Sequence, residues 1–201
     1  MLLVFYTSVY SSQEGVFYER VVKIAKNSIG LSYVPAVNGK NFTSDCIGFV
    51  RYVYYSAGID ISQVYGNGRG GVSSFYDGIE KRGWVYNEFP PNIGDLIFFD
   101  NTYDANRNRK WDDDLTHIGI VSGFGKHGTI FYIHYASGKV KEDRINLNYP
   151  NTHAFRQKDG KLYVINSHLR INRGEGYSKK EYLSSSFFRC FGRIPVRVKN
   201  E

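Results

Sequence analysis

The sequence predicts an α+β fold, in which helices come first along the chain and an antiparallel sheet follows. The main segments with helical spacing of apolar residues lie before residue 83, and short apolar runs typical of strands begin at residue 95. The 21 glycines, several of them in Asn-Gly or Gly-Gly pairs, indicate many tight turns between short strands. Helices followed by a run of strands favour the α+β class.

Three early segments are predicted to be helices, and each is followed by a glycine that can end it. They are residues 16–29, 46–57 and 72–82. The second is apolar on most sides, which indicates burial, and the polar residues 43–45 before it are good N-cap types. Strands are expected over residues 95–99, 117–122, 129–135 and 161–166, with a last short helix near 178–187 and a closing strand over 187–198.

The charge balance and the lack of long apolar runs restrict the partners. The chain has 26 Lys and Arg against 19 Asp and Glu, a net charge of +7, which favours anionic partners such as cell-envelope polymers. No nucleic-acid-binding motif accompanies the charge, so no nucleic-acid partner is expected. No apolar run approaches the ~18 residues of a transmembrane segment, and the apolar residues 1–6 are fewer than the roughly 7–15 of a secretory signal core.

Cys46 is the candidate nucleophile. It is the first residue of the predicted helix 46–57, where unpaired N–H groups and the helix dipole favour a thiolate, so we expect a lowered thiol pKa. The same N–H groups could hold an oxyanion during acyl transfer. The alternative is a buried structural cysteine. Cys190 has no such context and is expected to be structural.

Two of the five histidines are candidates for a general base and its orienting partner. His117 opens one predicted strand and His134 lies near the end of the next. Pairing Ser122 with Thr129 leaves the loop 123–128 and sets the histidines directly opposite each other on one face, with Cβ atoms ~4.5–5.5 Å apart. One alternative is two unrelated surface histidines. The other is a zinc site formed by the two histidines and Cys46, although no carboxylate at the usual ligand spacing completes such a site.

Around these residues the chain resembles the NlpC/P60 peptidoglycan endopeptidases. The segment SDCIGFVRYVYYSAGI resembles the nucleophile helix of that family, whose usual form is a DCSGF stretch. Three blocks follow in the family's order: PNIGDLIFF, THIGIV with the base, and FYIHYASGKV with the third polar residue. Upstream, AKNSIGLSYV resembles the approach to the active site that carries a tyrosine. The resemblance covers roughly residues 20–140.

The resemblance implies a papain-like fold, in which the helix that carries the cysteine packs on an antiparallel sheet that carries both histidines. By position, it implies Cys46 as nucleophile, His117 as base, His134 as orienting residue, Tyr33 near the oxyanion, and Asp45 as a ligand for a free amine of the substrate. It also implies cleavage of D-γ-glutamyl–diamino acid bonds in peptidoglycan stem peptides, with no cofactor required. The expected organisation is an N-terminal extension over 1–15, the catalytic core over 16–150, and a C-terminal extension over 151–201 packed on the same domain.

The chain departs from the family pattern at Ile47, where serine usually follows the nucleophile, and in an acidic insertion over residues 100–115. In the insertion, Asp104, Asn106 and Asn108 match the first three ligand positions of a calcium loop, and Asp112 falls at the ninth. Arg109 stands in place of the usual glycine and Leu115 in place of the bidentate glutamate. A structural calcium ion is therefore one expectation, and a solvated loop with internal ion pairs is the other.

Taken together, the residues and the resemblance predict a cysteine endopeptidase that acts on peptidoglycan peptides through an acyl-thioester. We expect it to be exported to the cell envelope, periplasmic or extracellular. Two alternatives stay open. One is an amidase or acyltransferase with the same fold and a different substrate. The other is a cell-wall-binding module without activity, whose charge of +7 would hold anionic polymers.

Overall fold

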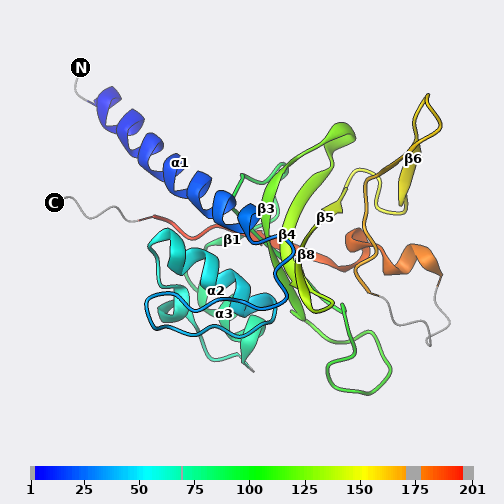
Figure 1. Ribbon diagram of the computed structural model, residues 1–201, viewed down its shortest axis with the longest axis horizontal. Helices are drawn as coiled ribbons and strands as arrows, with labels where there is room; N and C mark the ends of the chain where they lie inside the picture. The colour runs from blue at the N-terminus through cyan, green and yellow to red at the C-terminus, as the bar shows by residue number, and fades with distance from the viewer. Residues whose placement is uncertain (1–2, 69, 171–177, 197–201) are drawn as a thin grey trace.

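The structure is a computed structural model that describes residues 3–68, 70–170 and 178–196, with side chains described from residue 13 onward. The helices are α1 (Leu3–Asn27), α2 (Cys46–Ala57) and α3 (Gly71–Glu80), with short 3₁₀ turns η1 (Ile61–Val64), η2 (Lys126–Gly128), η3 (Lys179–Tyr182) and η4 (Ser184–Phe187). The strands are β1 (Val85–Tyr86), β2 (Leu96–Phe99), β3 (His117–Phe124), β4 (Ile130–Ala136), β5 (Lys139–Ile145), β6 (Ala154–Arg156), β7 (Leu162–Val164) and β8 (Phe188–Gly192). The three helices precede the strands in the described ranges, which confirms the α+β class (Figure 1).

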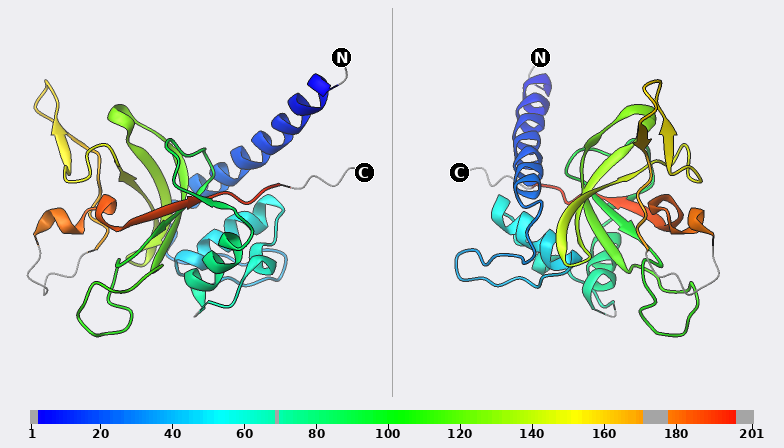
Figure 2. Two further views of the ribbon diagram at one scale, coloured as in Figure 1. Left: turned by 180° about the vertical axis from the view of Figure 1, so that it is seen from behind. Right: turned by 45° about the vertical axis from the view of Figure 1, so that its right-hand side comes forward.

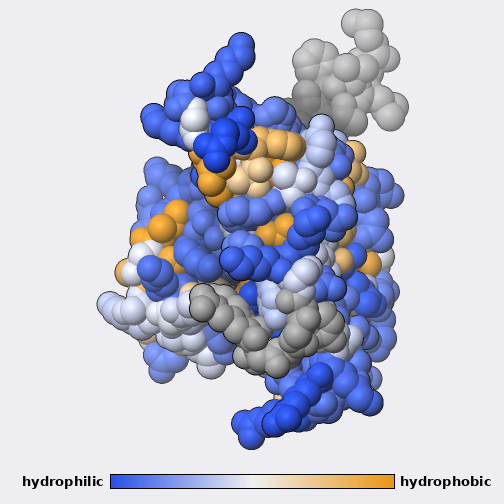
Figure 3. Space-filling model, turned by 90° about the vertical axis from the view of Figure 1, so that its right-hand side faces the viewer, coloured by the Kyte–Doolittle hydropathy of each residue, from blue (hydrophilic) through white to orange (hydrophobic). Residues whose placement is uncertain are grey.

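Within the described ranges, six strands form one antiparallel sheet in the order β1-β8-β2-β3-β4-β5. The last strand in the described residues, β8, lies between β1 and β2 and pairs with both. Strands β6 and β7 form a separate hairpin, which extends away from the sheet (Figure 2). On the side of the molecule that carries this hairpin, hydrophilic residues predominate and hydrophobic ones form small separate patches (Figure 3).

Helix α1 begins at Leu3, well before the expected start at residue 16, and ends at Asn27. Its second half packs against α2 and β3 through buried side chains that include Val21 and Ala25. Its first half projects away from the body of the molecule (Figures 1 and 2). Ile29, expected on the apolar face of this helix, lies beyond its end and is exposed.

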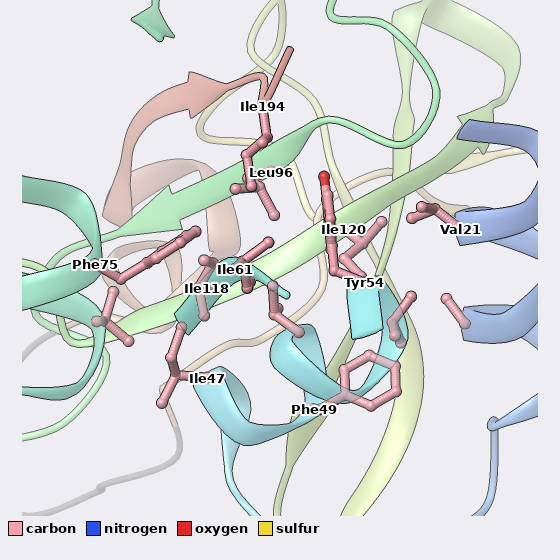
Figure 4. Packing of buried hydrophobic residues seen from close by; sticks show 14 of the residues in the cluster. Val21, Ile47, Phe49, Tyr54, Ile61, Phe75, Leu96, Ile118, Ile120 and Ile194 are labelled. Atoms are coloured by element: carbon pink, nitrogen blue, oxygen red, sulfur yellow. The ribbon is translucent and has the colours of Figure 1, made fainter. Parts of the chain in front are cut away.

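Helix α2 is the centre of the main core and has the predicted bounds. Asp45 is its N-cap, and Gly58 ends it in a left-handed conformation at φ 111°, which glycine adopts without steric cost. Its side chains Phe49 and Tyr54 are fully buried and pack with Ile118 and Ile120 of β3 in one cluster (Figure 4). This packing holds the N-terminus of α2 next to the start of β3.

A second cluster of buried side chains includes Phe99, Val121, Tyr132, Phe187 and Phe191. Side chains alternate between the faces of a strand, so His117 shares the face of Val121 on β3, and His134 shares that of Tyr132 on β4. Both histidine rings therefore lie next to this cluster.

The predicted register of the β3–β4 hairpin is wrong by two positions. Ile120 pairs with Ile133 and Phe124 with Ile130, and the register shifts at a β-bulge between Val121 and Gly123. Strand β3 continues further toward the turn than expected, β4 begins one residue later, and the bulge adds one residue to β3. Because the displacement is even, both histidines keep the same face, and they are diagonal neighbours instead of direct partners.

Candidate active site

Cys46 is the first residue of α2, as the sequence predicts. The Asp45 Oδ1 atom accepts a hydrogen bond of 2.7 Å from the backbone N–H of Gly48 and so caps the helix. At Gly48 a Cβ atom would overlap the backbone oxygen of Thr43, so glycine is required for the preceding loop to lie against the first turn. These contacts fix the position of the Cys46 backbone at the first turn of α2.

The thiol of Cys46 does not have the lowered pKa that the helix N-terminus predicts. Burial, reinforced by the negative charge of Asp45, raises its pKa to about 11. The backbone amides of Ile118, Ile47 and Cys46 favour the thiolate but do not outweigh the burial. The free protein therefore holds Cys46 as a neutral thiol at neutral pH.

His117 and His134 form a hydrogen-bonded pair. The distance from His117 Nε2 to His134 Nδ1 is 2.6 Å, and the rings meet edge to face at 80°. Both residues are buried, at 8% and 0% exposure. Burial lowers the pKa of both rings, and the neighbouring His134 lowers that of His117 further, so both are neutral at pH 7.

A carboxylate that the sequence analysis missed completes this chain of contacts. Asp143 Oδ2 lies 3.0 Å from His134 Nε2 and 2.7 Å from Lys141 Nζ. Burial alone would raise the pKa of Asp143, but hydrogen bonds from His134 and Lys141 hold it well below its usual range. Only Val140 and Ile145 of β5 are apolar, so the sequence showed no alternation from which this strand could be predicted.

The described residues include no hydrogen bond between Cys46 and His117. The sulfur lies instead beside the backbone amide of Ile118, the residue that follows the histidine. His117 Nε2 is occupied by His134, which leaves Nδ1 as the nitrogen that could face the thiol. Catalytic hydrogen bonds are often long in free enzymes and tighten when substrate binds.

Two tyrosines close to the thiol were also missed by the sequence analysis. Burial, with the charges of Cys46 and Asp45, raises the pKa of both Tyr65 and Tyr103. Tyr65 follows η1, and Tyr103 belongs to the insertion and is 56% exposed. Long loops gave no periodicity from which these positions could be predicted.

The two positions that only the resemblance singles out differ in exposure, since Tyr33 is exposed and Ile47 is buried. Tyr33 lies in the loop before α2 and is exposed, and the neighbouring Val34 N–H donates to Ser44 Oγ at 3.0 Å, which ties this loop to the turn before the cysteine. Ile47 is buried in the main core. Its side chain therefore serves packing and does not line the surface beside the thiol.

The insertion forms an ordered loop between β2 and β3. Its ends are joined by a hydrogen bond of 2.9 Å between Thr102 and Thr116 and one of 2.7 Å from Asn101 N to Asp113 O. Arg170 donates to Asn101 O at 2.7 Å and its guanidinium lies 4.8 Å from the centre of the Trp111 ring, so the C-terminal segment holds the loop in place.

The four predicted calcium ligands lie in one turn of this loop. Asn106 and Asn108 donate side-chain hydrogen bonds to Asp112 at 2.9–3.0 Å, and the backbone of Asn108 donates to Asp104 at 3.1 Å. Within the described residues, no group of three or more His, Cys, Asp or Glu side chains is arranged to hold a metal ion. Asn side chains are not in that set, so calcium binding at this turn stays a prediction.

The described part of the chain holds no helix that is both long enough and apolar enough to span a membrane. A comparison with curated proteins gives no match. A crystal structure from Staphylococcus aureus subsp. aureus Mu50, of a protein described as similar to lipoprotein, NLP/P60 family, is 24% identical, with a TM-score of 0.40. The likeness covers 63% of this chain and 36% of that one, so the chain spans about a third of that protein.

A comparison with protein families matches the NlpC/P60 family over residues 31–159. This range contains α2 with Cys46, the insertion, and the strands that carry His117, His134 and Asp143. The mixed helix and antiparallel-sheet architecture agrees with the papain-like fold that the resemblance implied. The chain belongs to the NlpC/P60 family.

Proposed function

We propose that this protein is a cysteine endopeptidase that cleaves D-γ-glutamyl–diamino acid bonds in peptidoglycan stem peptides. Membership of the family implies a cell-wall peptidase type of function. The observation that carries the proposed catalytic mechanism is the 2.6 Å contact between His117 Nε2 and His134 Nδ1. His117 precedes Ile118, whose backbone amide lies beside the Cys46 sulfur. A nucleophile, a base and a residue that orients the base are what acyl transfer requires.

The reaction begins from two neutral groups. Cys46 gives its thiol proton to His117 Nδ1 as the sulfur attacks the amide carbonyl, and the backbone N–H of Cys46 donates to the oxyanion. Protonated His117 then gives that proton to the leaving amine, and the C–N bond breaks to leave an acyl-thioester. A water molecule, deprotonated by His117, attacks the thioester, and the departing sulfur takes the proton back. None of these steps needs a cofactor.

The raised pKa of Cys46 defines how the base must work. A thiol with a pKa of about 11 is not a preformed thiolate at neutral pH, so the proton has to move during attack. The lowered pKa of His117 keeps its imidazole unprotonated and ready to accept. We therefore expect general-base catalysis rather than a resting thiolate–imidazolium pair.

The surface beside the thiol suits a peptide with a free amine. Asp45 is exposed and uses only one carboxylate oxygen, Oδ1, to cap the helix, so the other oxygen can accept a hydrogen bond from an ammonium group. Tyr65 and Tyr103 add two aromatic side chains near the thiol. The net charge of +7 fits a location among the anionic polymers of a cell envelope.

The test is hydrolysis of a purified muropeptide mixture, read by mass spectrometry. Cys46→Ala is compared with the wild type and with Cys190→Ala, which removes the buried cysteine of β8. We expect new fragments split after D-glutamate with the wild type and Cys190→Ala, and none with Cys46→Ala. Matched thermal melts check that both variants fold. Cleavage that survives Cys46→Ala, or no cleavage by the wild type, would contradict the proposal.

A further inference from the structure

We propose that Asp143 is a positioning residue of this site, which acts through His134 to hold His117 with its Nδ1 atom unprotonated and available to Cys46. The inference rests on the proposed function. It goes beyond a nucleophile, a base and an orienting histidine, because it adds a fourth member on a different strand, β5, together with its ion-pair partner Lys141.

The sheet register brings this carboxylate to the histidine. On the shared face of β4 and β5, Lys141 pairs directly with His134, and Asp143 pairs with Tyr132. Asp143 therefore approaches His134 diagonally, and its Oδ2 atom lies 3.0 Å from Nε2. His134 is fully buried and the Asp143 side chain is 14% exposed, so bulk water is a poor competitor for this contact.

The hydrogen-bond chain has one consistent arrangement of protons. A carboxylate can only accept, so His134 must carry its proton on Nε2. Neutral His134 then has a bare Nδ1, which accepts from His117 Nε2–H across 2.6 Å. Neutral His117 consequently has a bare Nδ1, the nitrogen that a general base facing Cys46 needs. The order of donors is set at Asp143 and transmitted through two rings.

Lys141 supports the carboxylate without replacing it. Its ammonium donates to the same Oδ2 atom at 2.7 Å, which holds the carboxylate in place. The charged or titratable groups that act on the histidine pair from neighbouring positions are Asp143 and Lys141 on β5 and Tyr132 on β4. Asp143 raises the pKa of both histidines and Lys141 lowers it.

These opposite effects give a readout that a purely structural role would not produce. The acidic limb of the kcat/KM profile marks the protonation of His117, because the protonated ring cannot accept the thiol proton. Removing the carboxylate of Asp143 lowers that pKa and moves the limb to lower pH. Removing the ammonium of Lys141 raises it and moves the limb to higher pH.

The experiment compares Asp143→Ala, Asp143→Asn and Lys141→Met with the wild type on a muropeptide that the wild type cleaves. We expect Asp143→Ala to lower kcat by about 10- to 100-fold with KM nearly unchanged. The acidic limb of its kcat/KM profile should move to lower pH. Asp143→Asn keeps an oxygen acceptor for His134 and loses the charge, so it should move the limb downward and retain most of kcat. Glu142→Gln is the matched control: it lies on the same strand, faces the other side and bonds Ser122 at 2.6 Å.

Nitrogen-15 spectra of the imidazoles test the tautomers without any substrate. The wild type and Asp143→Asn should show both His117 and His134 as Nε2–H forms, and Asp143→Ala should show His134 as a mixture. Wild-type spectra with His134 protonated on Nδ1 would overturn the proposal. So would an Asp143→Ala enzyme with unchanged kcat and limb. If the wild type cleaves no muropeptide, the proposed function fails, and the spectra still decide the role of Asp143.

Discussion

Gly119 of β3 lies against His134 of β4. A Cβ atom built at Gly119 would lie 3.3 Å from His134 Cβ, 3.0 Å from Tyr132 Cδ2 and 3.2 Å from the backbone oxygen of Ile133. All three distances are tighter than ordinary van der Waals contact, and one neighbour is backbone. The absence of a side chain at this position therefore lets the two histidines meet diagonally across the hairpin.

We expect Gly119→Ala to displace His134 and lower kcat by about tenfold or more, at a cost of about 1–3 kcal/mol in the free energy of unfolding. Gly123→Ala is the control on the same strand, because its Cβ would meet only Phe131 Cδ2 at an ordinary 3.8 Å. Muropeptide cleavage and chemical denaturation measure the two effects. Equal activity in the two variants would show that the His134 position tolerates the shift.

The reactivity of Cys46 should rise steeply with pH. With a pKa of about 11, only about one thiol in ten thousand is ionised at pH 7, so alkylation by iodoacetamide should be slow there and increase about tenfold per pH unit up to pH 10. Asp45→Asn removes a negative charge that raises this pKa, so it should accelerate alkylation. Mass spectrometry of the modified chain measures the rates. Rapid alkylation at pH 6 would show instead a stabilised thiolate.

Asp45 should have two separable roles. Asp45→Ala removes the N-cap of α2 and should lower the free energy of unfolding by about 1 kcal/mol, whereas Asp45→Asn keeps an oxygen acceptor and should cost only a few tenths. Both variants should raise KM for a stem peptide with a free N-terminal amine and leave KM for its N-acetylated form unchanged. A KM that rises equally for the two peptides would assign Asp45 to stability alone.

Calcium should bind the insertion weakly. Leu115 replaces the bidentate glutamate of a calcium loop, so we expect a dissociation constant of about 10⁻⁴–10⁻³ M rather than that of a sensor site. Titration calorimetry of the wild type and of Asp104→Ala measures it. Millimolar calcium should raise the melting temperature of the wild type only. If calcium concentrations up to about ten times that range produce no binding heat, the loop does not bind calcium and is only an internally hydrogen-bonded turn.

The candidate site divides into parts that local patterns determine and parts that they do not. The bounds of α2 and the place of Cys46 could be predicted, because helical spacing, an N-cap residue and Gly58 agree locally. The shared face of the two histidines could be predicted from strand alternation. Their register could not, because it depends on how far β3 continues and on the bulge before Gly123.

The missed parts depend on contacts between distant segments. Asp143 lies on a strand with charged residues at most of its positions, so no apolar alternation marked it, and its role exists only through β4. The raised pKa of Cys46 depends on burial, which the sequence around a helix N-terminus does not reveal. The position of β8 between β1 and β2 could not be predicted from local patterns either, because it pairs residues about a hundred positions apart in the chain.

That position of β8 has a consequence for biosynthesis. The family match ends at residue 159, yet β1 and β2 are joined only by a strand that starts at Phe188. While the chain is still being made, both strands have unpaired edges, which are open to wrong partners. The sheet can be completed only after the β8 segment has left the ribosome. A shortened chain that ends with the matched region should therefore aggregate instead of folding into a smaller domain.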